Sequence, residues 1–436
     1  MPRESIKNEV NEAFLLHQML RNTLLPPDEL SLPELILKLE NEKILFEAIQ
    51  RTRVWNPRVS EPVPKGGTIH LAFEYAKNPE DYSRFIQMLR ISPYAFWVLV
   101  DLIKKNPVFH NGSNHPQAPV EYQLAVTLFR LGRFGNGASL DDIAREAGVC
   151  TGTVHAYTER CFKAILSLHD MFVRPLTEEE KEREKRWIDE QMGFKGAWRD
   201  GWVMYDGTIV VLYQRPGWDG DAYYTRKCNS GMNLQVGNVG SNLRIVDYSH
   251  GHTGSAHDAS AFKGTCAYLH PDWFFKQNEF AWVDSAYPLS SRTIPVHKQP
   301  AADERQNRIF DQAVSHLRVR SEHCMGALKG RFQCLRGLRA NINSPQDHIQ
   351  ACRWMTVCII LHNLIIDVDG DVGHGFDGVH GPTKEREDFE VGGGLQREPE
   401  VEEEFTDDEE AGEAKRIKLT AELLEWRILS RGLNID

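Results

Sequence analysis

Two apolar segments of strand length, each carrying an aspartate, most restrict what this chain can fold into. WVMYDGTIVVL, which begins at Trp202, contains Asp206, and FAWVDSAYP, which begins at Phe280, contains Asp284. A carboxylate buried in such a segment without a partner costs several kcal/mol, so each should face a cation or a hydrogen-bond donor. The pattern therefore predicts strands with acidic groups placed where the apolar stretches stop.

The segments around these two strands predict an α/β layer with a mixed sheet. Strands that come first and helices that follow favour this architecture. Further strands are expected in YYTRKCN (223–229), MNLQVGNVG (232–240) and LRIVDYS (243–249). A helix-length insertion is expected near Ser255–Cys266, and long helices from about Asp303 to Gly337 and from Gln346 to Ile366.

The chain upstream of the strands is predicted to be helical. A helical region of unknown role is expected over residues 1–85, and a second helical region over residues 86–190. Ser92, followed by Pro93, predicts the start of one helix, because serine is a favoured N-cap and proline suits the first helical turn.

A helix-turn-helix is expected over residues 139–165. The apolar positions between Ile143 and Tyr157 fit two helices that cross at a tight turn, with Gly148 as the left-handed turn residue and Ser139 as the first N-cap. The second helix would present its outward face to a DNA groove. A plain helical hairpin is the alternative. The residues expected to contact DNA from this helix are Thr151, Thr153, His155 and Arg160.

The negative charge of the chain is concentrated near its C-terminus. The net charge is −11, and residues 384–413 alone contain 14 acidic and 3 basic residues, so the rest of the chain is neutral overall. Disorder is expected for a Gly/Asp-rich and acidic tail over 367–414. A short amphipathic segment over 415–436 is expected to need a partner or the folded body to dock on.

Neither a membrane span nor a secretory signal is expected. The longest apolar runs are interrupted by polar residues and fall short of the roughly 20 residues of a membrane helix, and the N-terminus is polar. The 8 cysteines are scattered without zinc-finger spacing, which predicts free thiols in a reducing compartment.

Three carboxylates are expected to converge, Asp206 and Asp284 from strands and Glu322 from a helix. Hard oxygen ligands without cysteine favour Mg²⁺ or Mn²⁺ over zinc, and two such ions about 4 Å apart stabilise the attacking and leaving oxygens of phosphoryl transfer. Each acid also has a structural alternative. Asp206 would begin a turn with Gly207, Asp284 would cap the segment after it, and Glu322 would pair with Arg318.

Several short motifs follow one another in the second half of the chain. They are Asp206-Gly207-Thr208, Tyr224-Thr225-Arg226-Lys227, Gly254-Ser255-Ala256-His257-Asp258, Asp284-Ser285-Ala286-Tyr287-Pro288, Arg318 with Glu322, and Leu328-Lys329-Gly330-Arg331-Phe332. In this order they resemble the motifs of Harbinger-type transposases and their domesticated relatives, which belong to the DDE superfamily of endonucleases. The upstream block 128–165 is similar to the N-terminal DNA-binding region of that family.

The resemblance implies an RNase H-like domain over 200–366, a mixed five-stranded sheet with helices on both faces. It implies a metal-dependent nuclease in which Asp206, Asp284 and Glu322 bind Mg²⁺ or Mn²⁺ and catalyse cleavage of a DNA phosphodiester, with Asp258 either assisting the metal site or capping a helix. It also implies DNA as a partner, a Myb-like partner protein and a nuclear location. A homo-oligomer is a further expectation. Further DNA contacts are expected from Arg318, Lys329 and Arg331.

Other interpretations stay open. The chain is alternatively a domesticated DNA- or protein-binding factor that keeps the fold without cleavage. His250, His252 and His257 with Asp258 suggest a zinc or iron hydrolase, although they lack the helical spacing of such sites. A short basic cluster, Lys415-Arg416-Ile417-Lys418, suggests a nuclear import signal.

Overall fold

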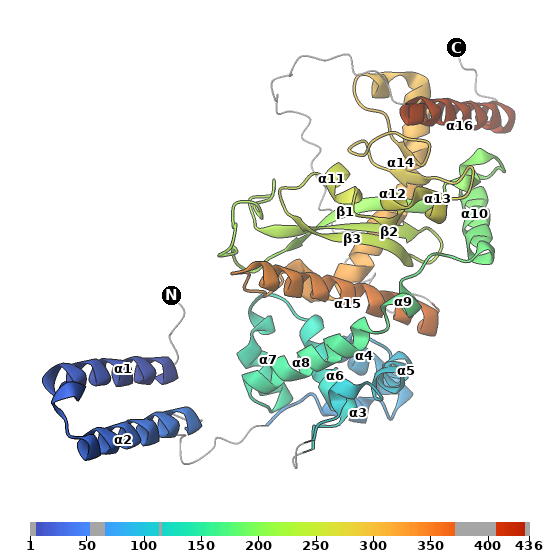
Figure 1. Ribbon diagram of the computed structural model, residues 1–436. Helices are drawn as coiled ribbons and strands as arrows, with labels where there is room; N and C mark the ends of the chain where they lie inside the picture. The colour runs from blue at the N-terminus through green and yellow to red at the C-terminus, as the bar shows by residue number, and fades with distance from the viewer. Residues whose placement is uncertain (1–5, 53–65, 113–115, 371–406, 432–436) are drawn as a thin grey trace. The chain divides into compact units, whose positions relative to one another are not determined.

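A computed structural model describes residues 6–52, 66–112, 116–370 and 407–431 (Figure 1). The chain divides into two compact units, Met1–Pro64 and Lys65–Asp436. In the first unit, α1 (Ile6–Leu24) and α2 (Leu32–Arg51) form a helical hairpin. A capping box of Ser31 and Glu34 starts α2.

The second unit begins with a group of helices, and the expected division at residue 85 falls inside one of them, α4 (Tyr82–Leu89). Ser92 caps α5 by accepting a hydrogen bond from the Ala95 amide at 3.0 Å, which confirms the predicted helix start. The helices are α3 (Leu71–Tyr75), α4 (Tyr82–Leu89), α5 (Pro93–Ile103), α6 (Val120–Leu131), α7 (Leu140–Ala147), α8 (Thr151–Leu166), α9 (His169–Phe172) and α10 (Glu178–Met192).

A mixed five-stranded sheet follows, as predicted, and its arrangement is consistent with an RNase H-like fold. The strands lie in the order β3-β2-β1-β4-β5. β1 is antiparallel to β2 and parallel to β4, so it is the central strand. β2 and β3 are antiparallel, and β4 and β5 are parallel. The bounds are β1 (Val203–Val211), β2 (Gly231–Val239), β3 (Ile245–Thr253), β4 (Ala281–Val283) and β5 (Thr293–Pro295).

The strand predicted in YYTRKCN is wrong. Residues 223–229 lie in the loop between β1 and β2, where Tyr224 forms only an isolated bridge with Ser230. The loop turns back on itself because the Thr225 amide donates a hydrogen bond to the Asn229 carbonyl at 2.8 Å. Cys228 adopts a left-handed conformation with a φ of 56°, which is incompatible with a strand.

Helices cover both faces of the sheet (Figure 1). One face of β1 carries Met204 and Val210, which pack against α14 (Arg305–Arg331) and α15 (Pro345–Asp369). The other face carries Val203 and Tyr205, which pack against short helices after β3. These short helices are α11 (Asp258–Phe262), α12 (Cys266–Leu269) and α13 (Pro271–Phe274). Alternation of side chains along β1 thus divides the core into two layers.

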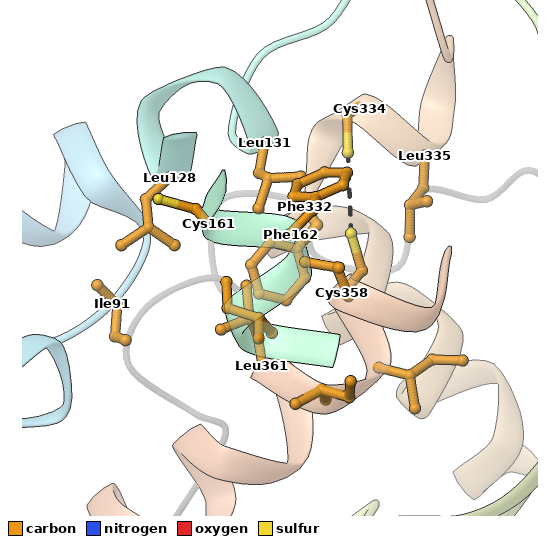
Figure 2. Close-up of a cluster of buried hydrophobic side chains, with 14 of the residues drawn as sticks. Ile91, Leu128, Leu131, Cys161, Phe162, Phe332, Cys334, Leu335, Cys358 and Leu361 are labelled. Atoms are coloured by element: carbon orange, nitrogen blue, oxygen red, sulfur yellow. Dashed lines mark hydrogen bonds between the residues drawn. The ribbon is translucent and has the colours of Figure 1, made fainter. Parts of the chain in front are cut away.

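α15 joins the sheet to the upstream helices. It lies between β3 and α8, and the core on its outer side is continuous with that of the helical region. Figure 2 shows this junction, where Leu131 of α6 and Phe162 of α8 meet Cys358 and Leu361 of α15. By length and composition α15 would suffice to cross a membrane, but most of its apolar stretch is buried inside this unit, as in a core helix.

The last described element is α16 (Asp407–Arg431), which docks on the body of the second unit. Leu419 and Leu423 are buried against an aromatic group that includes Trp198, whose Nε1 donates to the Leu419 carbonyl at 2.8 Å. Part of the tail expected to be disordered, 407–414, is therefore helical. The physical reason is that its acidic first turn suits the positive end of a helix dipole. Residues 371–406 of that tail lie outside the described residues.

Candidate active site

The register between the two parallel strands brings Asp206 and Asp284 side by side. Met204 of β1 lies opposite Trp282 of β4. Asp206 lies two residues after Met204, and Asp284 lies two residues after Trp282. Because side chains alternate along a strand, both carboxylates lie on the sheet face that α14 covers. Asp206 is the fourth residue of β1, and Asp284 directly follows the last residue of β4. We call Asp206 and Asp284 the carboxylate pair.

Arg318 of α14 lies between the two members of the carboxylate pair. Its Nη2 is 3.4 Å from Asp206 Oδ1, and its Nη1 is 3.6 Å from Asp284 Oδ1. The Arg318 side chain is 15% exposed, so the guanidinium is largely removed from water. Each aspartate also accepts a hydrogen bond from the next backbone amide, at 3.0 Å for Asp206 and 2.7 Å for Asp284.

The environment of Asp206 raises its pKa to about 6. Burial is the largest cause, because it penalises the charged form. Arg318 and the Gly207 amide act in the opposite direction and stabilise the carboxylate, while the negative charges of Asp284 and Asp258 raise the pKa further. One guanidinium therefore does not fully compensate the acidic charge gathered here.

Asp258 lies on the other side of β1. Its Oδ1 accepts hydrogen bonds from the amides of Asn233 and Gln235, both at 3.0 Å. Gln235 is paired with Gly207 across β1 and β2, on the face opposite to Asp206. A Cβ on Gly207 would lie 2.6 Å from Gln235 Nε2 and closer still to Asp258, so this glycine makes the space that the carboxylate fills. The N-cap of α11 is His257, so Asp258 does not cap this helix. Asp258 also lies on the face of the sheet opposite to the carboxylate pair.

Sequence reasoning missed the buried amides that hold Asp258. Gln235 is fully buried, and its Oε1 accepts a hydrogen bond from the Tyr287 hydroxyl at 2.5 Å. Burial, followed by the charges of Asp206 and Asp258, raises the pKa of Tyr287 well above its usual range, so the hydroxyl stays a donor. The signal in the sequence was the polar alternation Asn233 and Gln235 within an otherwise apolar strand.

Glu322 does not join the carboxylate pair in the described arrangement. It lies one helical turn beyond Arg318 on α14, is exposed, and belongs to none of the described ion pairs. In the part of the chain that the structure describes, no group of three or more His, Cys, Asp or Glu side chains is arranged to hold a metal ion. The expected convergence of three carboxylates is thus only partly present, and this arrangement does not fit a divalent cation, because Arg318 lies between the two aspartates.

Two of the basic residues expected to contact DNA are turned inward. Lys329 Nζ donates to Thr208 Oγ1 at 2.6 Å and to the Ile209 carbonyl at 2.8 Å, so it joins the end of α14 to β1. Arg331 is 1% exposed, so the predicted contact between Arg331 and a DNA phosphate is wrong for this arrangement. Both residues lie near the C-terminal end of α14, which runs into the core.

The expected helix-turn-helix segment forms α7 and α8. Ser139 caps α7 by accepting from the Asp142 amide at 3.1 Å, and Gly148 ends it with a φ of 64°, as predicted for the turn. His155 on α8 is exposed, whereas the other residues expected to contact DNA are half-buried. Arg160 donates to Gln123 Oε1 of α6 at 3.3 Å, which directs it toward the body. DNA binding by this segment stays a prediction.

The histidines after β3 do not support a zinc or iron hydrolase. His250 Nε2 lies 2.8 Å from Thr356 Oγ1 of α15, and burial lowers its pKa. Within the described ranges, neither His250 nor its neighbours His252 and His257 form a group suited to a metal ion.

Comparison with protein families gave a match to the sheet region. Residues 205–363 match a family model described as DDE superfamily endonuclease. The matched segment begins next to Asp206 and ends within α15, so it contains the sheet, the carboxylate pair and α14. Searches of curated proteins and of solved structures gave no significant match.

Proposed function

We propose that this chain is a transposase-like DNA endonuclease of the Harbinger type that depends on Mg²⁺ or Mn²⁺, because residues 205–363 match a family model described as DDE superfamily endonuclease. The observation that carries the proposal is the placement of Asp206 and Asp284 side by side beneath α14, the helix that also bears Glu322. DDE nucleases generally use divalent metals and act on DNA. We propose these three acids as the catalytic and metal-binding residues.

The chemistry of such an enzyme relies on positioned charge. A DNA phosphate is attacked in line by an oxygen nucleophile, and the site needs no covalent nucleophile of its own. The described arrangement has Arg318 paired with two of the three acids. The cleaving form is therefore proposed to differ from it in the positions of Arg318 and Glu322.

The upstream helices are proposed to bind the substrate. The first two turns of α8 carry His155 and the half-buried Thr151 and Thr153, and we propose that they contact a DNA groove. The chain before α3 contacts this segment near its turn, where the Thr68 amide donates to the Glu146 carbonyl at 2.8 Å. A nuclear location, a Myb-like partner protein and a homo-oligomer are further proposals from the family resemblance.

Two observations favour a second function. A domesticated DNA- or protein-binding factor would keep this fold without cleavage, and the pairing of Arg318 with both aspartates suits such a protein. The exposed Glu322 suits it as well.

A nicking assay separates the two functions. Supercoiled and linear DNA would be incubated with the full chain and Mg²⁺ or Mn²⁺. We expect the wild type to nick DNA, and Asp206→Asn and Glu322→Gln to lose at least about 100-fold of the rate, roughly 2.7 kcal/mol of barrier. The exposed Glu179→Gln on α10 is the matched control and should retain the rate. A wild type that binds DNA and does not cut it would instead establish the binding factor.

A further inference from the structure

The guanidinium of Arg318 is poorly satisfied where it lies. Its two contacts with the carboxylate pair, at 3.4 and 3.6 Å, are longer than the roughly 2.7–2.9 Å of close charge-assisted hydrogen bonds. Its Nε is buried and has no hydrogen-bond partner. A buried donor without a partner is costly, so the present position of Arg318 is not a tightly held one.

Another arginine of the chain shows what a closely fitted pair looks like. Arg174 contacts Glu180 through two hydrogen bonds of 2.8 Å, one from each terminal nitrogen to a different carboxylate oxygen. Arg318 instead reaches one oxygen on each of two carboxylates, that of Asp206 within β1 and that of Asp284 just after β4.

The carboxylate pair needs a positive charge beside it, whether this comes from a metal ion or from a side chain. Burial and the charges of Asp284 and Asp258 all oppose ionisation of Asp206, and Arg318 is the largest influence that favours it. Removal of every cation would leave an uncompensated carboxylate in a largely buried place, which is strongly unfavourable.

We propose that Arg318 is the resident counter-cation of the metal-free site, and that a divalent cation must displace it from the carboxylate pair in order to bind. Metal binding and pairing of Arg318 with Asp206 and Asp284 are then mutually exclusive. This inference rests on the proposed function, because it assigns cation binding to the same carboxylates. Its consequence is that Arg318 weakens the apparent affinity for the metal, since only the fraction of molecules with Arg318 displaced is competent to bind.

Direct measurement of Mn²⁺ binding tests the proposal without reliance on cleavage. The full chain, freed of metal, would be titrated with Mn²⁺ and followed by electron paramagnetic resonance or calorimetry. We expect Arg318→Met to tighten binding by about tenfold relative to the wild type. Arg318→Lys keeps the charge but lacks the planar guanidinium that spans two carboxylates. The affinity of this variant for Mn²⁺ should therefore lie between those of the wild type and Arg318→Met.

Arg320→Met is the matched control on the same helix. Arg320 donates to the carbonyls of Gly240 and Ser241, at 2.6 and 3.1 Å, away from the carboxylate pair. This variant should bind Mn²⁺ within about twofold of the wild type. Circular dichroism melting would establish that each variant is folded, and Arg318→Gln provides a polar substitute if the methionine variant is not.

The outcomes separate this inference from the proposed function. Equal or weaker Mn²⁺ binding by Arg318→Met, with binding abolished by Asp206→Asn, would overturn the role of Arg318 and leave the nuclease proposal standing. If Arg318→Met is the only protein that binds Mn²⁺, the result would support the displacement of Arg318 by the metal and indicate that the wild type is a binding factor without cleavage. No binding by any variant would overturn both proposals.

Discussion

Gly207 lies directly against the carboxylate of Asp258, across the central strand from Asp206. A side chain at Gly207 would place its Cβ 2.6 Å from Gln235 Nε2 and closer still to Asp258 Oδ1. The glycine thus allows an acid and two buried amides to pack beneath the strand that carries the candidate site.

Gly207→Ala is expected to destabilise the fold by about 1–3 kcal/mol, because overpacking forces the hydrogen-bonded group apart. Thermal or denaturant unfolding would measure it. The matched control is Gly326→Ala on α14, where no atom lies within 4 Å of the added Cβ. Since alanine is a better helix former than glycine, the stability of the control variant should rise by roughly 0.5–1 kcal/mol. Unchanged stability in Gly207→Ala would contradict the packing described for Asp258.

The ion pairs of Glu279 predict a loss of stability in acid. Burial raises the pKa of Glu279, but hydrogen bonds from Lys185, the Lys276 amide and Lys181 outweigh it and lower the pKa to about 2. Because the folded pKa lies below the ordinary value of 4.5, this contribution is present above pH 4.5 and is lost as pH falls toward 2. Urea unfolding as a function of pH would show the decline.

Glu279→Gln should cost about 3 kcal/mol at pH 7, since it leaves buried lysines without their carboxylate. The variant should also show a shallower decline between pH 4.5 and 2 than the wild type. Exposed Glu179→Gln should leave the curve unchanged. If the stability of Glu279→Gln fell with pH as steeply as that of the wild type, the Glu279 carboxylate would not be the source of the loss of stability in acid.

Docking of α16 predicts a difference between two leucines on the same helix. Leu423 is 1% exposed and packs in an aromatic group with Trp198, whereas Leu429 is 86% exposed. Leu423→Ala should cost about 2–4 kcal/mol because a buried methyl-bearing side chain is removed. Leu429→Ala should change stability by less than about 0.5 kcal/mol. Equal effects, measured by chemical denaturation, would argue against the described docking.

His155 predicts the contribution of α8 to DNA affinity. It is exposed in the first half of the helix proposed to contact DNA, and His155→Ala should weaken binding about fivefold, roughly 1 kcal/mol. Fluorescence anisotropy at one fixed salt concentration would measure the change. His110→Ala, an exposed histidine outside α8, is the control. Equal affinity of both variants and the wild type would remove α8 from the proposed interface.

Local pattern alone was sufficient for much of the fold. Apolar alternation predicted β1 with Asp206, and a serine followed by proline predicted the start of α5 at Ser92. Gly148 was predicted as the left-handed residue that ends α7, and it has that conformation. These features depend on neighbours within a few residues, and such short-range effects are visible in a sequence. β5 was missed because its three residues stand among polar neighbours, without the apolar run that marked the equally short β4.

The sequence by itself determined that two apolar segments of strand length each carry an aspartate, that strands precede helices from Trp202 onward, and that the segment 205–363 matches a family model described as DDE superfamily endonuclease. Only the tertiary structure decided which acids meet. The register of β1 with β4 joins Asp206 to Asp284, and the path of α14 places Arg318 between them while Glu322 stays outside. These relationships depend on how segments distant in the chain pack together, and no local preference of a residue encodes that distance or orientation.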